Sequence, residues 1–111
     1  MNAAIDFDWQ TICDVSDLQP MLGVRALLNG EQVAIFKVNA TVYAIGAIDP
    51  FTGAAVLSRG IVGDLQGKLV VASPIYKQHF DLKTGICLED ESVKVRTYKV
   101  REQGGKVELA P

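Results

Sequence analysis

Short apolar or β-branched segments, separated by turn signals, are the feature that most limits what this sequence can fold into. No segment shows the 3.6-residue period of an amphipathic helix, and residues 49–60 have room for one helical turn at most. Many short strands at close spacing predict an all-β fold, a small barrel or sandwich of antiparallel strands. The expected strands cover residues 9–15, 24–28, 32–38, 42–48, 57–62, 68–72, 78–82, 93–101 and 106–109.

Turn residues predict how several of these strands connect. Asn29 and Gly30 tolerate the positive φ that a type I′ hairpin turn requires at both of its central positions. Asn39 and Ala40 mark a second tight turn shortly afterwards. Residues 24–48 are therefore expected to form a three-stranded meander.

Length and composition describe a globular chain and exclude several classes of partner. The 111 residues fit a single domain over residues 1–111, in which residues 1–8 form a loose N-terminal tail. The apolar fraction of 49% is enough for a core that needs no disulfide or metal. The formal net charge is −2 with scattered basic residues, which argues against a nucleic-acid partner. No stretch is apolar for long enough to cross a membrane, and residues 1–9 lack the basic and apolar regions of a secretory signal.

Few residues of this sequence are suited to catalysis. His79 is the single histidine, and no phosphate-binding glycine loop, Cys-x-x-Cys pair or nucleophile elbow is present. The acidic run at residues 89–91 is typical of a solvated face. Cys13 and Cys87 are expected to be reduced, dispensable thiols of a cytoplasmic protein. Residue chemistry therefore predicts no active site in this chain.

Two turn-rich loops carry the strongest functional signal. The first reads Asp-Pro-Phe-Thr-Gly at residues 49–53, with Leu-Ser-Arg-Gly at residues 57–60. The second reads Ser-Pro-Ile-Tyr at residues 73–76, with Phe-Asp-Leu-Lys-Thr-Gly at residues 80–85. This frame resembles the two loops of a Rieske domain, which read Cys-Pro-His and Cys-Pro-x-His and hold a [2Fe–2S] cluster.

The resemblance implies that all four cluster ligands have been replaced. Asp49 and Ser73 stand at the cysteine positions, and Phe51 and Tyr76 stand at the histidine positions. None of these residues supplies the thiolate or imidazole that such a cluster requires, so we expect no cofactor and no metal in this chain. Bulky side chains are expected to fill the vacated space. Asp49, Ser73 and the Tyr76 hydroxyl are expected to form hydrogen bonds across the two loops.

The chain is most similar to the small subunits of bacterial assimilatory NAD(P)H nitrite reductases. Residues 33–36, 48–51, 56–60, 72–74 and 87–91 carry this likeness. The resemblance implies a cofactor-free small subunit of an oxidoreductase complex that serves nitrate assimilation and nitrogen metabolism. Its partner would be the nitrite reductase large subunit, carrying FAD, an iron–sulfur cluster and sirohaem, which reduces nitrite to ammonium.

Two other functions stay open at this point. One is a Rieske-type [2Fe–2S] electron-transfer ferredoxin with atypical ligands, which the four replaced positions disfavour. The other is an enzyme that uses Cys13 or Cys87 as a nucleophile, although no local motif supports it.

The former cluster loops are also the expected docking surface for the large subunit. Apolar residues would form its centre, with Asp49, Arg59 and Lys77 as a polar rim. The alternative is that Phe51 and Tyr76 point inward and fill the old cluster site. The apolar centre would consist of Pro50, Phe51, Pro74, Ile75 and Tyr76.

Overall fold

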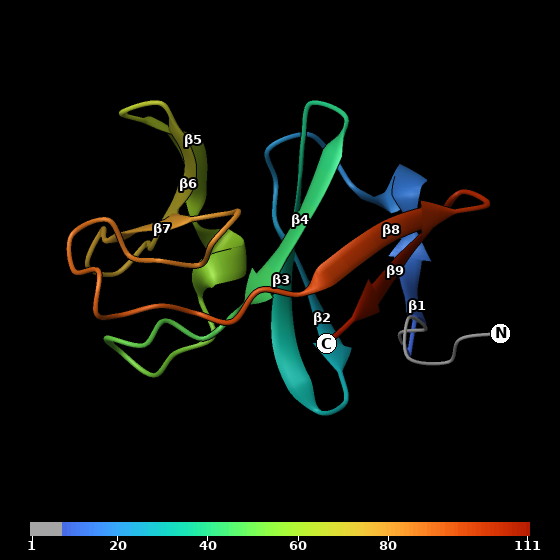
Figure 1. Ribbon diagram of the computed structural model, residues 1–111, viewed down its shortest axis with the longest axis horizontal. Coiled ribbons are helices and arrows are strands. Elements are labelled where there is room, and N and C mark those ends of the chain that lie inside the picture. Colours follow the sequence, from blue (N-terminus) through green and yellow to red (C-terminus); the bar gives the residue numbers. More distant parts are fainter. Residues whose placement is uncertain (1–7) are drawn as a thin grey trace, which may run out of the picture.

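Three antiparallel sheets of three strands each make up the described part of the chain, residues 8–111 of the computed structural model (Figure 1). The terminal sheet has the order β1 (Gln10–Asp14), β9 (Lys106–Ala110), β8 (Lys99–Gln103). The central sheet runs β2 (Val24–Leu28), β3 (Glu31–Val38), β4 (Thr41–Gly46), and the tip sheet runs β5 (Ile61–Leu65), β6 (Lys68–Ala72), β7 (His79–Asp81). Two short 3-10 turns, η2 (Val15–Asp17) and η3 (Leu57–Arg59), complete the elements.

The predicted all-β class of short antiparallel strands is confirmed, and the three sheets stack in the manner of a sandwich rather than closing into one barrel. Figure 1 shows the tip sheet at one end of the long axis and the β8–β9 hairpin near the other. Most of the tail predicted at residues 1–8 lies outside the described residues. Within residues 8–111 there is no helix with the length and apolarity of a membrane span.

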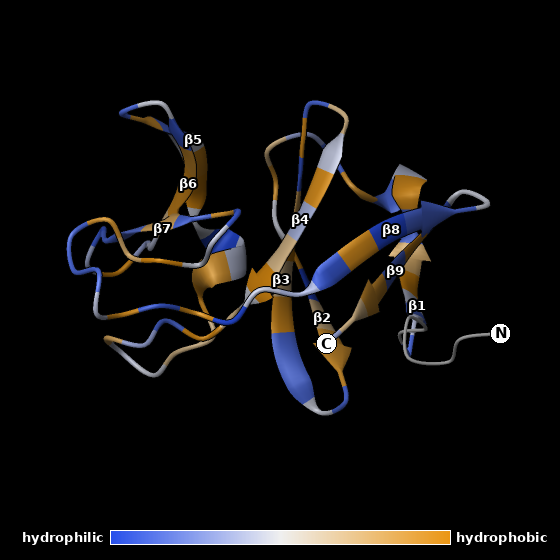
Figure 2. Ribbon diagram, in the orientation of Figure 1, coloured by the Kyte–Doolittle hydropathy of each residue, from blue (hydrophilic) through white to orange (hydrophobic). Residues whose placement is uncertain are grey.

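The central strand β3 is buried on both of its faces. Residues 33–36 read Val-Ala-Ile-Phe and are completely inaccessible to solvent. An unbroken apolar run is what a strand needs when neither face meets water, since successive side chains point to opposite sides. Figure 2 shows hydrophobic residues along the middle of β3 and hydrophilic residues at its first end. β3 therefore forms part of two separate cores.

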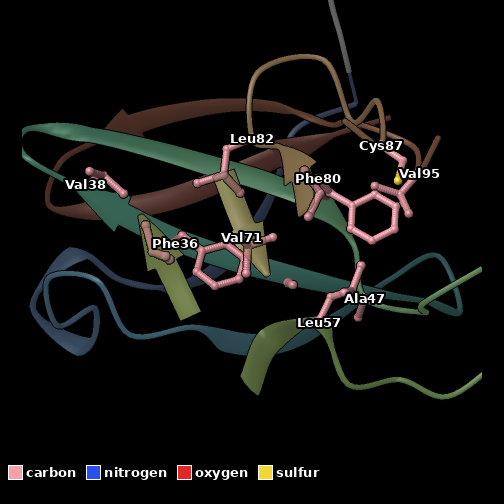
Figure 3. Close-up of a cluster of buried hydrophobic side chains, with 12 residues drawn as sticks. Phe36, Val38, Ala47, Leu57, Val71, Phe80, Leu82, Cys87 and Val95 are labelled. Carbon is pink, nitrogen blue, oxygen red and sulfur yellow. The ribbon is translucent and has the colours of Figure 1, made fainter. Parts of the chain in front are cut away.

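The tip-side core lies between the central and tip sheets, and Figure 3 shows its side chains converging from both. The terminal core lies between the opposite face of the central sheet and the terminal sheet. Each core is apolar throughout its buried residues, so the sheets are held together mainly by burial of hydrocarbon. The tip-side core contains Ala34, Phe36, Val38, Ile45, Ala47, Leu57, Val62, Val71, Phe80, Leu82, Cys87 and Val95; the terminal core contains Leu18, Leu28, Val33, Ile35, Val42, Ala44, Val107 and Leu109.

The predicted meander is confirmed, with β2, β3 and β4 adjacent in sequence order. Asn29 and Gly30 have φ of 51° and 81°, as the predicted type I′ turn requires. Asn39 also adopts a positive φ of 56° at the second turn. Local turn chemistry thus predicted this part of the chain correctly.

Two predicted strands are wrong in part. Residues 57–62 begin as the turn η3, because the buried Leu57 anchors that turn and Gly60 lies against the β6 backbone. A Cβ at Gly60 would lie 2.5 Å from the Ala72 carbonyl oxygen, so only glycine fits there. Within residues 93–98 only Lys94 and Thr97 make isolated bridges, and the strand β8 begins at Lys99. The change of alternation within residues 93–101 reflects this boundary.

Gly85 is the glycine at which substitution should be most damaging. Its φ is +77°, and an added Cβ would lie 2.1 Å from the Val95 carbonyl oxygen. Gly67 has a nearly equal φ of +79° but open space around the Cβ position, so it is a matched control. We expect Gly67→Ala to lower the free energy of unfolding by about 1 kcal/mol through left-handed strain alone. Gly85→Ala should lower it by roughly 3 kcal/mol or more, since the clash is with backbone.

Urea denaturation of the two variants measures this difference. Equal losses at the two positions would show that the close approach of Gly85 to Val95 is unimportant.

Candidate functional site

Two loops of matching conformation form the candidate site beside the tip sheet. We call residues 49–53 and 73–78 the tip loops; the first follows β4 and the second joins β6 to β7. The Gly53 amide donates to the Asp49 carbonyl oxygen over 2.8 Å, and the Lys77 amide donates to the Ser73 carbonyl oxygen over 3.1 Å. Gly53 and Lys77 both have positive φ, at 75° and 66°. Each loop is thus a five-residue turn closed by its own backbone.

The first side chains of the two turns hydrogen-bond each other. The Ser73 hydroxyl donates to Asp49 Oδ2 over 2.5 Å, and both residues are completely buried. Asp49 Oδ1 accepts the Phe51 amide at 2.8 Å, while Ser73 Oγ accepts the Ile75 amide at 3.4 Å. They are the two buried polar residues of the described chain, and hydrogen bonding offsets their desolvation. The predicted contact of Asp49 with Ser73 is confirmed.

The residues at the former histidine positions differ in orientation. Phe51 is 37% exposed, and its ring lies 6.3 Å from the Phe80 ring, so it partly covers the core. Tyr76 is 64% exposed, and no hydrogen bond of residues 8–111 involves its hydroxyl. The predicted hydrogen bond between the Tyr76 hydroxyl and the Asp49–Ser73 pair is therefore wrong. Of Phe51 and Tyr76, only Phe51 contributes to filling the site.

The four residues do not fit a [2Fe–2S] cluster. A Rieske centre takes two thiolates and two neutral imidazoles. Here Asp49 and Ser73 use their oxygens on each other, Phe51 has no donor atom and Tyr76 points to solvent. Residues 8–111 also contain no group of three or more histidines, cysteines or carboxylates placed to share a metal ion. Electron transfer through atypical ligands at this site is accordingly disfavoured.

Every residue of the predicted docking surface is exposed except Asp49. Pro50, Pro74, Ile75, Tyr76 and Lys77 are exposed on the loops. Arg59 is also exposed, but it lies on η3. Asp49 was expected on the polar rim and is instead buried, because its carboxylate turns inward to Ser73 and the Phe51 amide.

Glu89 binds His79, an interaction that the sequence did not indicate. Its carboxylate accepts the His79 amide at 2.7 Å and lies 2.6 Å from the His79 ring Nδ1. Partial burial raises the pKa of Glu89, but the hydrogen bonds from His79 outweigh this and leave the pKa below its usual value. The pair attaches the start of β7 to the loop after Cys87 and is structural.

Neither cysteine is placed as a nucleophile. Both thiols are free, and they pack in different cores, Cys87 in the tip-side core and Cys13 against the terminal core. Burial raises the pKa of the Cys87 thiol, and Glu89 beside it raises the pKa further against opposing backbone hydrogen bonds. Burial and the carboxylates of Asp17 and Asp14 raise the pKa of Cys13. Both thiols therefore stay protonated and unreactive near neutral pH.

The second tip loop carries two local costs. Lys77 adopts the left-handed conformation that side chains disfavour. The Gln78 side-chain oxygen is buried and has no hydrogen-bond donor within residues 8–111. Such an orphaned acceptor costs about 1–3 kcal/mol. Costs of this kind concentrate at functional sites, so they direct attention to this loop. No feature of the sequence revealed the Gln78 position.

Comparisons with protein families, with known proteins and with solved structures agree with one another. The Rieske-like [2Fe-2S] domain family matches residues 8–110. The nitrite reductase (NADH) small subunit of Salmonella typhimurium is 50% identical over 103 residues, which cover 91% of this chain and 95% of that protein. A crystal structure from Mycobacterium tuberculosis, described as an NADH-dependent nitrite reductase small subunit, superposes with a TM-score of 0.91 at 46% identity, covering 96% of each chain.

A longer protein contains a similar domain. The nitrite reductase [NAD(P)H] large subunit of Klebsiella oxytoca is 38% identical over 99 residues, which cover 89% of this chain but 10% of that protein. A domain of this kind therefore occurs both as a short chain and within a large one.

The left-handed conformation of Lys77 predicts that glycine stabilises the isolated chain. Lys77→Gly removes the strain of the side chain at positive φ, which exceeds the entropic cost of glycine in the unfolded chain. We expect a gain of about 0.5–1 kcal/mol in the free energy of unfolding, measured by urea denaturation. Lys83→Gly is the control, because Lys83 is exposed and has no positive φ, and it should lose stability. A loss in both variants would contradict the prediction.

Proposed function

This chain belongs to the nitrite reductase small subunits within the Rieske-like [2Fe-2S] domain family, and from this membership we propose how it serves the enzyme. It is a subunit without cluster or active site that binds the catalytic large subunit through its tip loops. The observation that carries this proposal is the pair of tip loops, which keep the Rieske frame but have hydrogen-bonded, apolar and aromatic residues where ligands belong.

The partner is the nitrite reductase large subunit. A similar domain lies within the Klebsiella oxytoca large subunit, so in that protein the two parts are joined in one chain. A separate small subunit must reach the same association through a surface contact. We propose that the partner carries FAD, an iron–sulfur cluster and sirohaem and reduces nitrite to ammonium, and that the complex is cytoplasmic.

The composition of the tip suits a protein interface. Ile75 and Tyr76 are large hydrophobic residues exposed to 44% and 64%, next to exposed prolines. Apolar and aromatic residues inside a polar rim are typical of interface centres, and Lys77 and Arg59 supply such a rim. The tip sheet also lies at one end of the molecule, away from the β8–β9 hairpin, so a partner can approach without obstruction (Figure 1).

We expect the purified chain to bind no iron–sulfur cluster. Asp49, Phe51, Ser73 and Tyr76 cannot replace two thiolates and two imidazoles. The measurement is anaerobic incubation with ferrous iron and sulfide, followed by absorbance and EPR spectroscopy. A Rieske ferredoxin treated identically is the positive control. A stoichiometric [2Fe–2S] signal from this chain would refute the prediction and restore electron transfer as its function.

Tyr76→Ala should weaken binding to the purified large subunit by about 2 kcal/mol, as loss of an aromatic interface residue does. Lys77→Glu should weaken it by roughly 1 kcal/mol, with a slower association rate. Leu27→Ala is the control for the first change, because Leu27 is equally exposed, at 65%, but lies on β2. Lys106→Glu is the control for the second, at the β8–β9 hairpin. Surface plasmon resonance measures all four.

The melting temperatures of the four variants should stay within a few degrees of the wild type, since the altered side chains are exposed. Weaker binding by the two controls together with unchanged binding by the tip variants would place the interface at another surface.

A further inference from the structure

The buried pair Asp49–Ser73 has no direct part in docking. Both residues are completely inaccessible to solvent, so a partner cannot touch them. They are nevertheless the two buried polar residues of the described chain, and replacing both partners of a buried hydrogen bond by apolar groups of the same shape can be nearly neutral or stabilising. Their presence under the docking surface therefore calls for a role other than stability.

We propose that Asp49 and Ser73 are positioning residues for docking: their hydrogen bond joins the tip loops and holds the exposed apolar residues in the arrangement that the large subunit binds. This inference rests on the proposed docking of the tip. In cluster-containing Rieske domains the bound cluster links the two loops. In this chain the hydrogen bond between Asp49 and Ser73 would link them instead.

The hydrogen-bond pattern shows how the pair acts on the surface. Asp49 Oδ1 accepts the Phe51 amide, and Ser73 Oγ accepts the Ile75 amide. In both turns the buried side chain thus binds the backbone amide of the residue two positions later in the chain, which is a proposed docking residue. The side chains that join the loops are the same ones that orient Phe51 and Ile75.

No other hydrogen bond of residues 8–111 connects the first tip loop with the second. Each loop is closed by its own backbone bonds, from Gly53 to Asp49 and from Lys77 to Ser73. The Phe51 ring lies 6.3 Å from the ring of Phe80 on β7. Loss of the Asp49–Ser73 bond therefore leaves two intact turns whose relative position is less restricted.

Affinity depends on the fraction of molecules in which both loops are correctly placed. If this fraction falls tenfold, the apparent dissociation constant rises tenfold, although every contact residue is unchanged. A role in positioning thus predicts a loss of binding that a role in general stability does not.

The test compares Ser73→Ala with Val107→Ala in the full chain. Val107 is completely buried in the terminal core, so its truncation lowers the melting temperature without touching the tip. Binding to the purified large subunit is measured by surface plasmon resonance, and exchange of the Phe51 and Ile75 amides by hydrogen–deuterium exchange NMR. Ser73→Ala should weaken binding at least tenfold and accelerate exchange at both amides. Val107→Ala should change neither at temperatures where both variants are folded.

Asp49→Asn provides a second, milder variant in case Ser73→Ala does not fold. The amide group keeps an acceptor for the Phe51 amide and offers a donor to Ser73, so binding should fall by no more than about threefold. If Ser73→Ala folds, the Phe51 and Ile75 amides of Asp49→Asn should exchange at rates between those of the wild type and those of Ser73→Ala. If Ser73→Ala does not fold, these amides of Asp49→Asn should still exchange more slowly than amides of an unfolded chain.

The outcomes separate this inference from the proposed docking site. If Tyr76→Ala weakens binding and Ser73→Ala does not, the tip docks but the buried pair does not position it, and the inference is overturned. If Val107→Ala weakens binding as much as Ser73→Ala, the effect is one of stability alone, which also overturns it. If Tyr76→Ala leaves binding unchanged, the docking proposal fails and the inference fails with it.

Discussion

Burial of β3 on both faces is the constraint from which the rest of the structure follows. Its unbroken run Val33 to Phe36 cannot remain in water on either side, so the chain must supply a cover for each face. The terminal sheet covers one face and the tip sheet covers the other, and each forms a separate apolar core. This layering places the tip sheet and the tip loops beside it at one end of the molecule (Figure 1).

At that end the fold has kept the form of a cluster-binding site and changed its chemistry. The two turns retain matching closures, but a buried hydrogen bond stands between their first side chains. A hydrogen bond restricts only two atoms, whereas a bound cluster restricts all four of its ligands. Phe51 and Tyr76 are not held as ligands and can therefore take different orientations. The Phe51 ring lies against the core, and the Tyr76 ring points toward solvent. A fold can carry different chemistry through a change of a few residues at its site.

The sequence predicted those properties that depend on neighbouring residues. Turn chemistry at Asn29-Gly30 and at Asn39 predicted the meander correctly, because φ preferences act within two or three residues. The loss of ligands could also be seen from residue types alone, since neither an aspartate, a serine, a phenylalanine nor a tyrosine supplies thiolate or imidazole. The family resemblance was carried by loop motifs whose spacing survives without the ligands.

Only the tertiary structure decided which residues far apart in the chain contact one another. Asp49 was expected on the rim and is buried because Ser73, 24 positions later, donates to it. Tyr76 points outward although the same reasoning joined it to that pair. Glu89 is exposed, as the acidic run predicts, but it also accepts the amide of His79, ten positions earlier, which the sequence did not indicate. The alternation of residues 93–98 predicts a strand, but only Lys94 and Thr97 pair there, as isolated bridges, since strand pairing depends on a partner edge. Sequence periodicity determines which segments can form strands, whereas packing determines which side chains of the loops end inside.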